Sequence, residues 1–276
     1  MTPASAAIAR VEERVRSYHA TRALVALSGG VDSSVVLAVA ARGLGRARVT
    51  AVTAVSPSYP AGELEAAALV ATVVGVEHRV VETAEVAREA YARNDGLRCF
   101  HCKTELYATL GRMAPSGDRP GIALLAGANA DDEGDYRPGL RAGELRGVRN
   151  PLLEEGIAKP MVRAMARHLA LPVADKPTLA CLSSRVAFGV RITPGLLARV
   201  DAAERLVRAM GFEQVRVRHH GLRATIEVPT PEVARLMAAP GLSALLEGLR
   251  ALGWREVSVD PDGYRSGRMN ATLVEF

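Results

Sequence analysis

Residues 23–34, Ala-Leu-Val-Ala-Leu-Ser-Gly-Gly-Val-Asp-Ser-Ser, constrain the fold more than any other stretch of the chain. Residues 23–27 form an apolar run that predicts a buried strand, and residues 33–42 predict a helix packed on a sheet. Between them, Gly29 and Gly30 let the backbone come close to a ligand, and the N–H groups of the helix start favour an anion. Three hydroxyl groups add donors: Ser28, Ser33 and Ser34. An ordinary strand–helix turn with a capped helix would show a weaker version of this pattern.

The loop, residues 28–34, resembles the PP-loop of the ATP pyrophosphatases. A Walker A loop is excluded because no Gly-Lys-Ser/Thr follows, and the Gly-x-Gly-x-x-Gly pattern of dinucleotide-binding proteins is also missing. The resemblance implies that the loop, with Asp32 within it, holds the pyrophosphate end of ATP. It also implies chemistry that transfers AMP rather than the terminal phosphate.

Composition narrows the choice of partner and compartment. The chain has a formal net charge of +5, with 35 Lys and Arg residues of which only Lys103, Lys159 and Lys176 are lysine. We expect no nucleic-acid partner, because no basic run is present and only 4% of residues are aromatic. No apolar run is long enough to span a bilayer and the N-terminus lacks a signal-peptide core, so we expect a cytoplasmic protein. In that reducing compartment the three cysteines predict metal or sulfur chemistry rather than disulfides.

Apolar segments alternate between strand and helix patterns through the first two thirds of the chain. Expected strands after the first are residues 48–55, 77–82, 121–126 and 171–174, and expected helices are 62–74, 84–93 and 159–170. This alternation predicts an α/β fold with a doubly wound parallel sheet, whose ligands bind at the carboxyl ends of the strands. The Ser28 loop and Gly127 both follow expected strands. We assign residues 1–190 to this PP-loop domain.

Residues 191–276 are expected to form a small α+β domain for substrate binding or oligomerisation. A helix is predicted at 196–210, one or two helices at 232–252, and strands at 214–219, 224–228 and 257–259. Arg216 and Arg218 fall on one face of a strand, because side chains repeat every second residue. They are either a clamp for a phosphate, oriented by Glu204 and Glu227, or two solvated arginines.

Cys99-Phe-His-Cys102-Lys103 has the spacing of a zinc, iron–sulfur or redox site. Cys181 is the third cysteine, and three thiolates would leave one iron of a cuboidal cluster open. Zinc held by the cysteines and His101, or two buried helix cysteines, are the alternatives. Lys103 would lower the pKa of a neighbouring thiol.

An acidic loop follows the expected strand 121–126. It contains Asp131, Asp132, Glu133 and Asp135, and favours a magnesium site to which Asp32 also contributes, since Mg²⁺ takes one or two carboxylates and keeps several waters. A solvated charged loop is the alternative.

Four strings occur in the order found in the LarE family, and the resemblance covers nearly the whole chain. They are the loop 28–34, Cys99-x-x-Cys102-Lys103, Gly127-x-Asn129-x-Asp131-Asp132 with Asp135-Tyr-Arg137-Pro-Gly139, and Cys181-Leu-Ser-Ser184-Arg185. The family comprises ATP-dependent sulfur transferases that build the nickel-pincer nucleotide cofactor of lactate racemase. The resemblance extends to Arg216, Arg218 and Glu227 in the second domain.

The resemblance implies that a carboxylate of pyridinium biscarboxylate mononucleotide is adenylated and that sulfur then displaces AMP. Expected substrate-binding residues are Arg137, Ser184, Arg185, Glu204, Arg216, Arg218 and Glu227. With three cysteines the chain resembles the branch that carries sulfide on a [4Fe-4S] cluster rather than the branch that sacrifices one cysteine. A sulfide source and a homo-oligomer are further expectations. A PP-loop tRNA thiolase and a non-catalytic nucleotide-binding protein are the alternatives.

Overall fold

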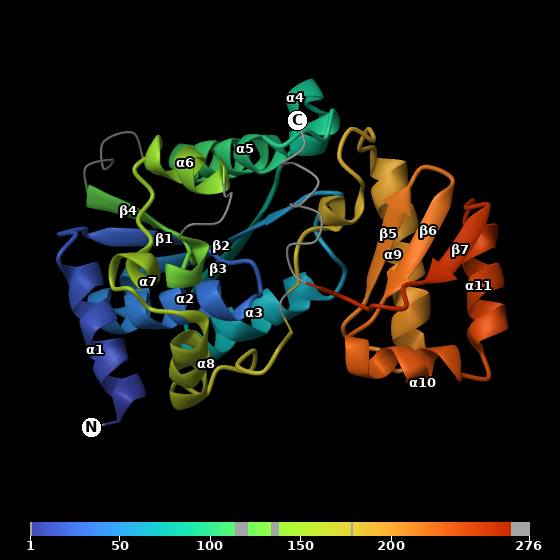
Figure 1. Cartoon of the computed structure of the whole chain (residues 1–276). Coiled ribbons are helices and arrows are strands. Elements are labelled where there is room, and N and C mark those ends of the chain that lie inside the picture. Colours follow the sequence, from blue (N-terminus) through green and yellow to red (C-terminus); the bar gives the residue numbers. More distant parts are fainter. Residues whose placement is uncertain (1, 114–120, 134–137, 178, 266–276) are drawn as a thin grey trace. The chain divides into compact units, whose positions relative to one another are not determined.

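The computed structural model describes residues 2–113, 121–133, 138–177 and 179–265 (Figure 1). The chain forms two compact units, which are described separately. The first comprises Met1–Ser56, Ala61–Glu85 and Cys99–Leu179, and the second comprises Pro57–Pro60, Val86–Arg98 and Ala180–Phe276.

The first unit is built on a four-stranded parallel sheet with the order β3-β2-β1-β4. Its strands are β1 (Arg22–Ala26), β2 (Val49–Val55), β3 (Glu77–Glu82) and β4 (Ile122–Leu125). The chain moves outward from β1 to β3 and then returns to place β4 on the other side of β1. This confirms the predicted doubly wound α/β fold, and it puts the switch point between the carboxyl ends of β1 and β4.

Helices cover both faces of this sheet (Figure 1). One face carries α1 (Pro3–Arg16), α2 (Val31–Leu44), α3 (Glu63–Val74) and α8 (Lys159–His168), whose apolar side chains form the main core with β1, β2 and β4. The other face carries α5 (Arg98–Met113), which packs Leu110 and Tyr107 on the sheet.

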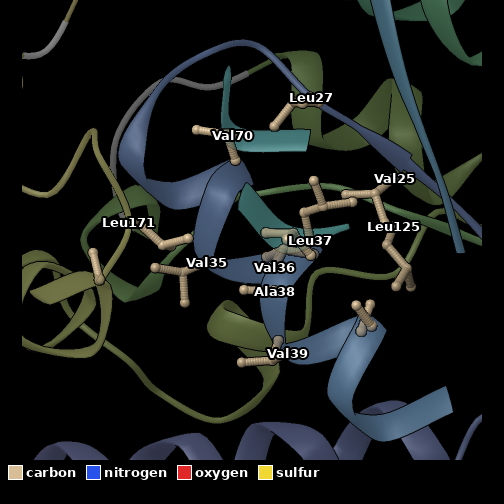
Figure 2. Close-up of a cluster of buried hydrophobic side chains, with 14 of the residues drawn as sticks. Val25, Leu27, Val35, Val36, Leu37, Ala38, Val39, Val70, Leu125 and Leu171 are labelled. Carbon is tan, nitrogen blue, oxygen red and sulfur yellow. The ribbon is translucent and has the colours of Figure 1, made fainter. Parts of the chain in front are cut away.

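Helix α2 lies at the centre of the main core (Figure 2). Its residues 33–41 are all buried, so the helix is covered on every side rather than along one stripe. Val35, Val36 and Leu37 are fully buried and pack among side chains from the sheet and from neighbouring helices. The start of α2 is therefore held rigidly at the end of β1, which matters for any ligand bound there.

The predicted fifth strand, residues 171–174, is wrong. This segment is a turn after α8 and joins no sheet. Leu171, Val173 and Ala174 are buried in the main core, whereas Pro172 between them is exposed. The apolar side chains of this segment are therefore buried from a turn, and not through strand pairing.

The remaining elements of the first unit are short. They are η1 (Arg46–Arg48), η2 (Glu85–Ala87, of which Glu85 belongs here), η4 (Ala130–Asp132), α6 (Pro138–Glu144) and α7 (Pro151–Glu154).

The second unit is a three-stranded mixed sheet with helices, as the pattern predicted. The strands are β5 (Arg216–His220), β6 (Arg223–Glu227) and β7 (Glu256–Val259), with β6 antiparallel to β5 and parallel to β7. The helices are α4 (Glu89–Ala92), α9 (Pro194–Ala209), α10 (Val233–Met237) and α11 (Leu242–Ala251), with the short η5 (Leu182–Arg185) and η6 (Thr230–Glu232). In the described part of the chain no helix is long and apolar enough to cross a membrane.

Candidate active site

The loop after β1 turns back on itself before α2 begins. Gly29 has a φ of 79°, in the left-handed region that favours glycine, and Gly30 is the N-cap of α2. The Ser33 hydroxyl donates to the Gly30 carbonyl at 3.1 Å and lies 3.1 Å from the Ser28 hydroxyl, while the Ser34 hydroxyl donates to the same carbonyl at 2.8 Å. The first N–H groups of a helix have no carbonyl of their own to bind, so this loop presents donors and the positive end of the α2 dipole to an anion.

The turn after β4 touches this loop, as expected from the switch point. A Cβ added to Gly127 would lie 2.6 Å from the Ser33 backbone nitrogen, so only glycine allows the two segments to approach this closely. Asn129 then donates from its amide to Asp32 Oδ1 at 3.1 Å. The first and fourth strands therefore deliver their polar residues to one place.

Two lysines flank the loop. Lys159, the first residue of α8, places its ammonium 2.5 Å from Asp32 Oδ2. Lys176 donates to the Gly29 carbonyl at 3.1 Å and pairs with the buried Glu63 at 2.8 Å. Sequence reasoning did not place these lysines here. The available signal was composition: a chain that otherwise uses arginine retains only three lysines.

Asp131 and Asp132 of the acidic loop each accept a hydrogen bond from a backbone N–H, and Asp135 lies outside the described residues. Asp132 Oδ2 accepts from the Asn129 N–H at 3.0 Å and closes a capping box. Asp131 Oδ2 accepts from the Lys159 N–H at 2.8 Å, at the start of α8. Among the described residues, no group of three or more His, Cys, Asp or Glu side chains is arranged to hold a metal ion.

Cys99 and Cys102 lie one turn apart at the start of α5 and belong to the first unit. Cys99 is exposed and Cys102 is half-buried, and neither forms a disulfide. Lys103 follows on the same helix, with its ammonium 5.9 Å from the centre of the Tyr107 ring. Gly139 of α6 packs closely against Lys103, since a Cβ there would meet Lys103 Cγ at 3.0 Å.

Cys181 belongs to the second unit and is the N-cap of η5. Arg185 fixes this turn from within. Its guanidinium donates to the Ala180 carbonyl at 2.6 Å and to the Cys181 carbonyl at 3.0 Å, and it forms a two-point ion pair with Glu204 of α9 at 2.7 and 3.2 Å. Both side chains are fully buried. This buried pair therefore holds the backbone of the Cys181 turn in place.

A second buried ion pair supports the same turn. Arg218 pairs with Glu227 at 2.9 Å across the β5–β6 ladder and donates to the Ser184 carbonyl at 2.8 Å. The Ser184 hydroxyl in turn donates to the Cys181 carbonyl at 2.8 Å. Arg218 is 7% exposed, so the alternative of two solvated arginines on a half-exposed sheet does not apply.

Arg216 is buried beside these pairs. Its side chain donates to the Val215 carbonyl at 2.8 Å and stacks over the Tyr264 ring at 5.1 Å. Burial first, and then the nearby Arg185, lower the pKa of Arg216 to about 10. A charged guanidinium in such a place costs folding free energy, because burial disfavours the charged form.

Residues 91–98 also hold the Cys181 turn, and sequence reasoning missed them. The Tyr91 hydroxyl lies 2.6 Å from the Ser183 hydroxyl, Arg98 donates to the Ser183 carbonyl at 3.0 Å, and Asn94 donates to the Ala187 carbonyl at 2.8 Å. Their roles arise from contacts across about ninety residues of sequence, which no local pattern reveals. Arg137, an expected substrate residue, lies outside the described residues.

The chain is similar to several known proteins. The NAD synthase family matches residues 4–101, which include the loop after β1. The chain is 35% identical to the pyridinium-3,5-bisthiocarboxylic acid mononucleotide synthase of Lactiplantibacillus plantarum over 92% of this chain and 91% of that protein. It is 42% identical to an uncharacterized protein of Synechocystis over 92% and 94% of the two chains, and 26% identical to the NH(3)-dependent NAD(+) synthetase of Chlorobaculum tepidum over 62% of each.

The fold and the loop define an ATP-dependent enzyme of the PP-loop class. Within that class, the chain belongs to the LarE family, the family of the Lactiplantibacillus synthase.

Proposed function

We propose that this enzyme converts a carboxylate of pyridinium-3,5-biscarboxylic acid mononucleotide into a thiocarboxylate. The observation that carries the proposal is the likeness to the Lactiplantibacillus synthase along 92% of the chain, which includes the anion-binding loop and the Cys181 turn. A carboxylate is a poor acceptor of a nucleophile, so it must first be activated. ATP supplies that activation.

The reaction runs in two balanced steps. A carboxylate oxygen of the substrate attacks the α-phosphorus of ATP, forming an acyl-adenylate and releasing pyrophosphate. A sulfide then attacks the acyl carbon, the C–O bond to AMP breaks, and AMP leaves with the electron pair. In the first step the N–H groups at the start of α2 and the hydroxyls of Ser28 and Ser33 stabilise the negative charge that moves onto the pyrophosphate.

Magnesium is proposed to bind together with ATP. Its proposed protein ligands are Asp32, within the loop, and Asp131 and Asp132 of the acidic loop. The support is the position of Asp32 in the first turn of α2, where a polyphosphate would also lie. Magnesium would screen the phosphate charge while the chain's own donors orient the α-phosphorus.

The sulfur carrier is proposed to be a [4Fe-4S] cluster held by Cys99, Cys102 and Cys181. The residues fit in type and number, because all three cysteines are outside disulfides and Cys99 and Cys102 share one helical turn. When bound, such a cluster supplies sulfide to the activated carboxylate. The Arg185–Glu204 pair holds the Cys181 turn in place for either this role or that of a sacrificial donor. Arg216 and Arg218 are proposed to bind the phosphate of the substrate.

The test is turnover under anaerobic conditions with the mononucleotide, ATP, Mg²⁺ and sulfide. We expect AMP, pyrophosphate and a product heavier than the substrate by the exchange of one oxygen for sulfur, measured by mass spectrometry. Gly30→Val should abolish AMP formation, since its side chain blocks the approach of the phosphates. Full AMP formation with tRNA and none with the mononucleotide would instead support a tRNA thiolase.

A further inference from the structure

The position of Lys159 has a consequence for how the metal and ATP bind. Asp32 presents two carboxylate oxygens, and both have partners within the first unit. Oδ1 accepts from the Asn129 amide at 3.1 Å, and Oδ2 faces the Lys159 ammonium at 2.5 Å. A divalent cation bound to Asp32 would stand next to the same oxygens and would be repelled by the ammonium.

The Lys159 side chain can change conformation while its backbone stays in place. Its N–H is fixed by Asp131 at the start of the ten-residue helix α8, and Pro160 follows in the first turn. Its side chain is 26% exposed, so the ammonium borders solvent rather than a packed core. A lysine head is a compact point charge on a flexible stem, unlike the planar fork of the arginines that the chain uses elsewhere.

Lys176 provides the contrast. Its ammonium also lies at the loop, but it bonds the Gly29 carbonyl and the buried Glu63. The Glu63 side chain is 7% exposed, so Lys176 is paired with a buried carboxylate rather than with Asp32. The two lysines therefore add similar charge to the same loop, while only Lys159 is paired with Asp32 among the described contacts.

We propose that Lys159 and the divalent metal compete for Asp32, and that metal-bound ATP transfers the Lys159 ammonium from Asp32 to the polyphosphate. This inference rests on the proposed function for its nucleotide and metal. It makes Lys159 a binding residue for the phosphates of ATP. It also predicts opposite effects on the two ligands when the lysine charge is removed.

The experiment uses the full-length protein and the variants Lys159→Met, Lys176→Met and Arg167→Met. Arg167 is on the same helix and its exposed side chain pairs with Asp175, so its variant removes a positive charge away from the loop. Mn²⁺ binding without nucleotide is measured by electron paramagnetic resonance. Pyrophosphate binding with Mg²⁺ is measured by calorimetry.

We expect Lys159→Met to bind Mn²⁺ at least about tenfold more tightly, and pyrophosphate at least about tenfold more weakly, about 1.4 kcal/mol in each case. Lys176→Met should leave Mn²⁺ affinity within about twofold of the wild type, and Arg167→Met should change neither affinity. A role of Lys159 in folding alone would not change the two affinities in opposite directions.

The competition is refuted if Lys159→Met binds Mn²⁺ no better than the wild type, or if Lys176→Met gains as much. Unchanged pyrophosphate affinity in Lys159→Met would refute the transfer to phosphate. If Lys159→Met does not fold, Lys159→Gln replaces it. ATP–pyrophosphate exchange by the wild type with the mononucleotide is run in parallel. If no exchange is found, the proposed function is contradicted. The Mn²⁺ affinities test the competition between Lys159 and the metal separately.

Discussion

Replacing Gly29 by alanine should damage the loop through two separate physical effects. The first is backbone strain, because a φ of 79° costs a non-glycine residue about 1–2 kcal/mol. The second is a collision, because a Cβ at this position would lie 2.5 Å from the Glu63 carbonyl oxygen. That atom belongs to the backbone at the start of α3, so it cannot rotate away, and overpacking of this kind costs about 1–3 kcal/mol. Together the expected loss of stability is about 2–5 kcal/mol.

Gly30→Ala is the matched control for this loss. Gly30 has a φ of −90°, and a Cβ there would approach only the Ser28 hydroxyl, at 3.4 Å, among the described atoms. Its free energy of unfolding should change by less than about 1 kcal/mol. Urea denaturation followed by circular dichroism compares the two variants with the wild type. A difference between them below about 1 kcal/mol would show that the loop adapts easily, and the argument from close packing would fail.

Three more predictions concern the second unit. Arg185→Met should lower the free energy of unfolding by about 3 kcal/mol, measured by thermal or chemical denaturation. This is the low end for a broken buried ion pair, because Glu204 still forms an ion pair with Arg208. A loss below about 1 kcal/mol would contradict the role of Arg185 in holding the Cys181 turn. Since burial lowers the pKa of Arg216 to about 10, its charge opposes folding at pH 7 and this cost fades only as the pH rises above about 10. Arg216→Met should therefore unfold no earlier than the wild type at pH 7, yet bind the mononucleotide at least about tenfold more weakly, and an affinity within about twofold would exclude the phosphate clamp. Intact-mass spectrometry after turnover should find Cys181 unchanged. If Cys181 instead loses H₂S, and the variant Cys99→Ala is still active, the sulfur comes from a sacrificed cysteine and not from a cluster.

The sequence was most informative where one local pattern decides the outcome. The buried run before Ser28 and the glycines after it predicted the strand, the loop and α2, because burial and backbone freedom are both encoded within a few residues. The switch point followed from the alternation of strands and helices, and it correctly brought Gly127 to the loop.

Longer-range relations were less predictable. Residues 171–174 were predicted as a strand because a short apolar stretch does not reveal whether another strand lies beside it; Leu171 and Val173 are buried without strand pairing. The roles of Lys159 and Lys176 depend on contacts 127 and 147 residues away in sequence, to Asp32 and Gly29. These contacts are set by how α8 and the turn after it pack in the fold, and no spacing rule within the sequence predicts them.

Because lysine is scarce in this chain, amine-reactive reagents can report on the loop at residues 28–34. Reagents that acylate primary amines have only three side chains to modify in this protein, and two of them, Lys159 and Lys176, are held at the loop by carboxylates. Lys103, on α5, serves as an internal reference in the same sample. Peptide mapping after brief acylation would therefore follow nucleotide occupancy residue by residue, without any engineered label. In this arginine-rich protein, the reactivity of Lys159 and Lys176 can therefore be used to footprint the loop where ATP is expected to bind.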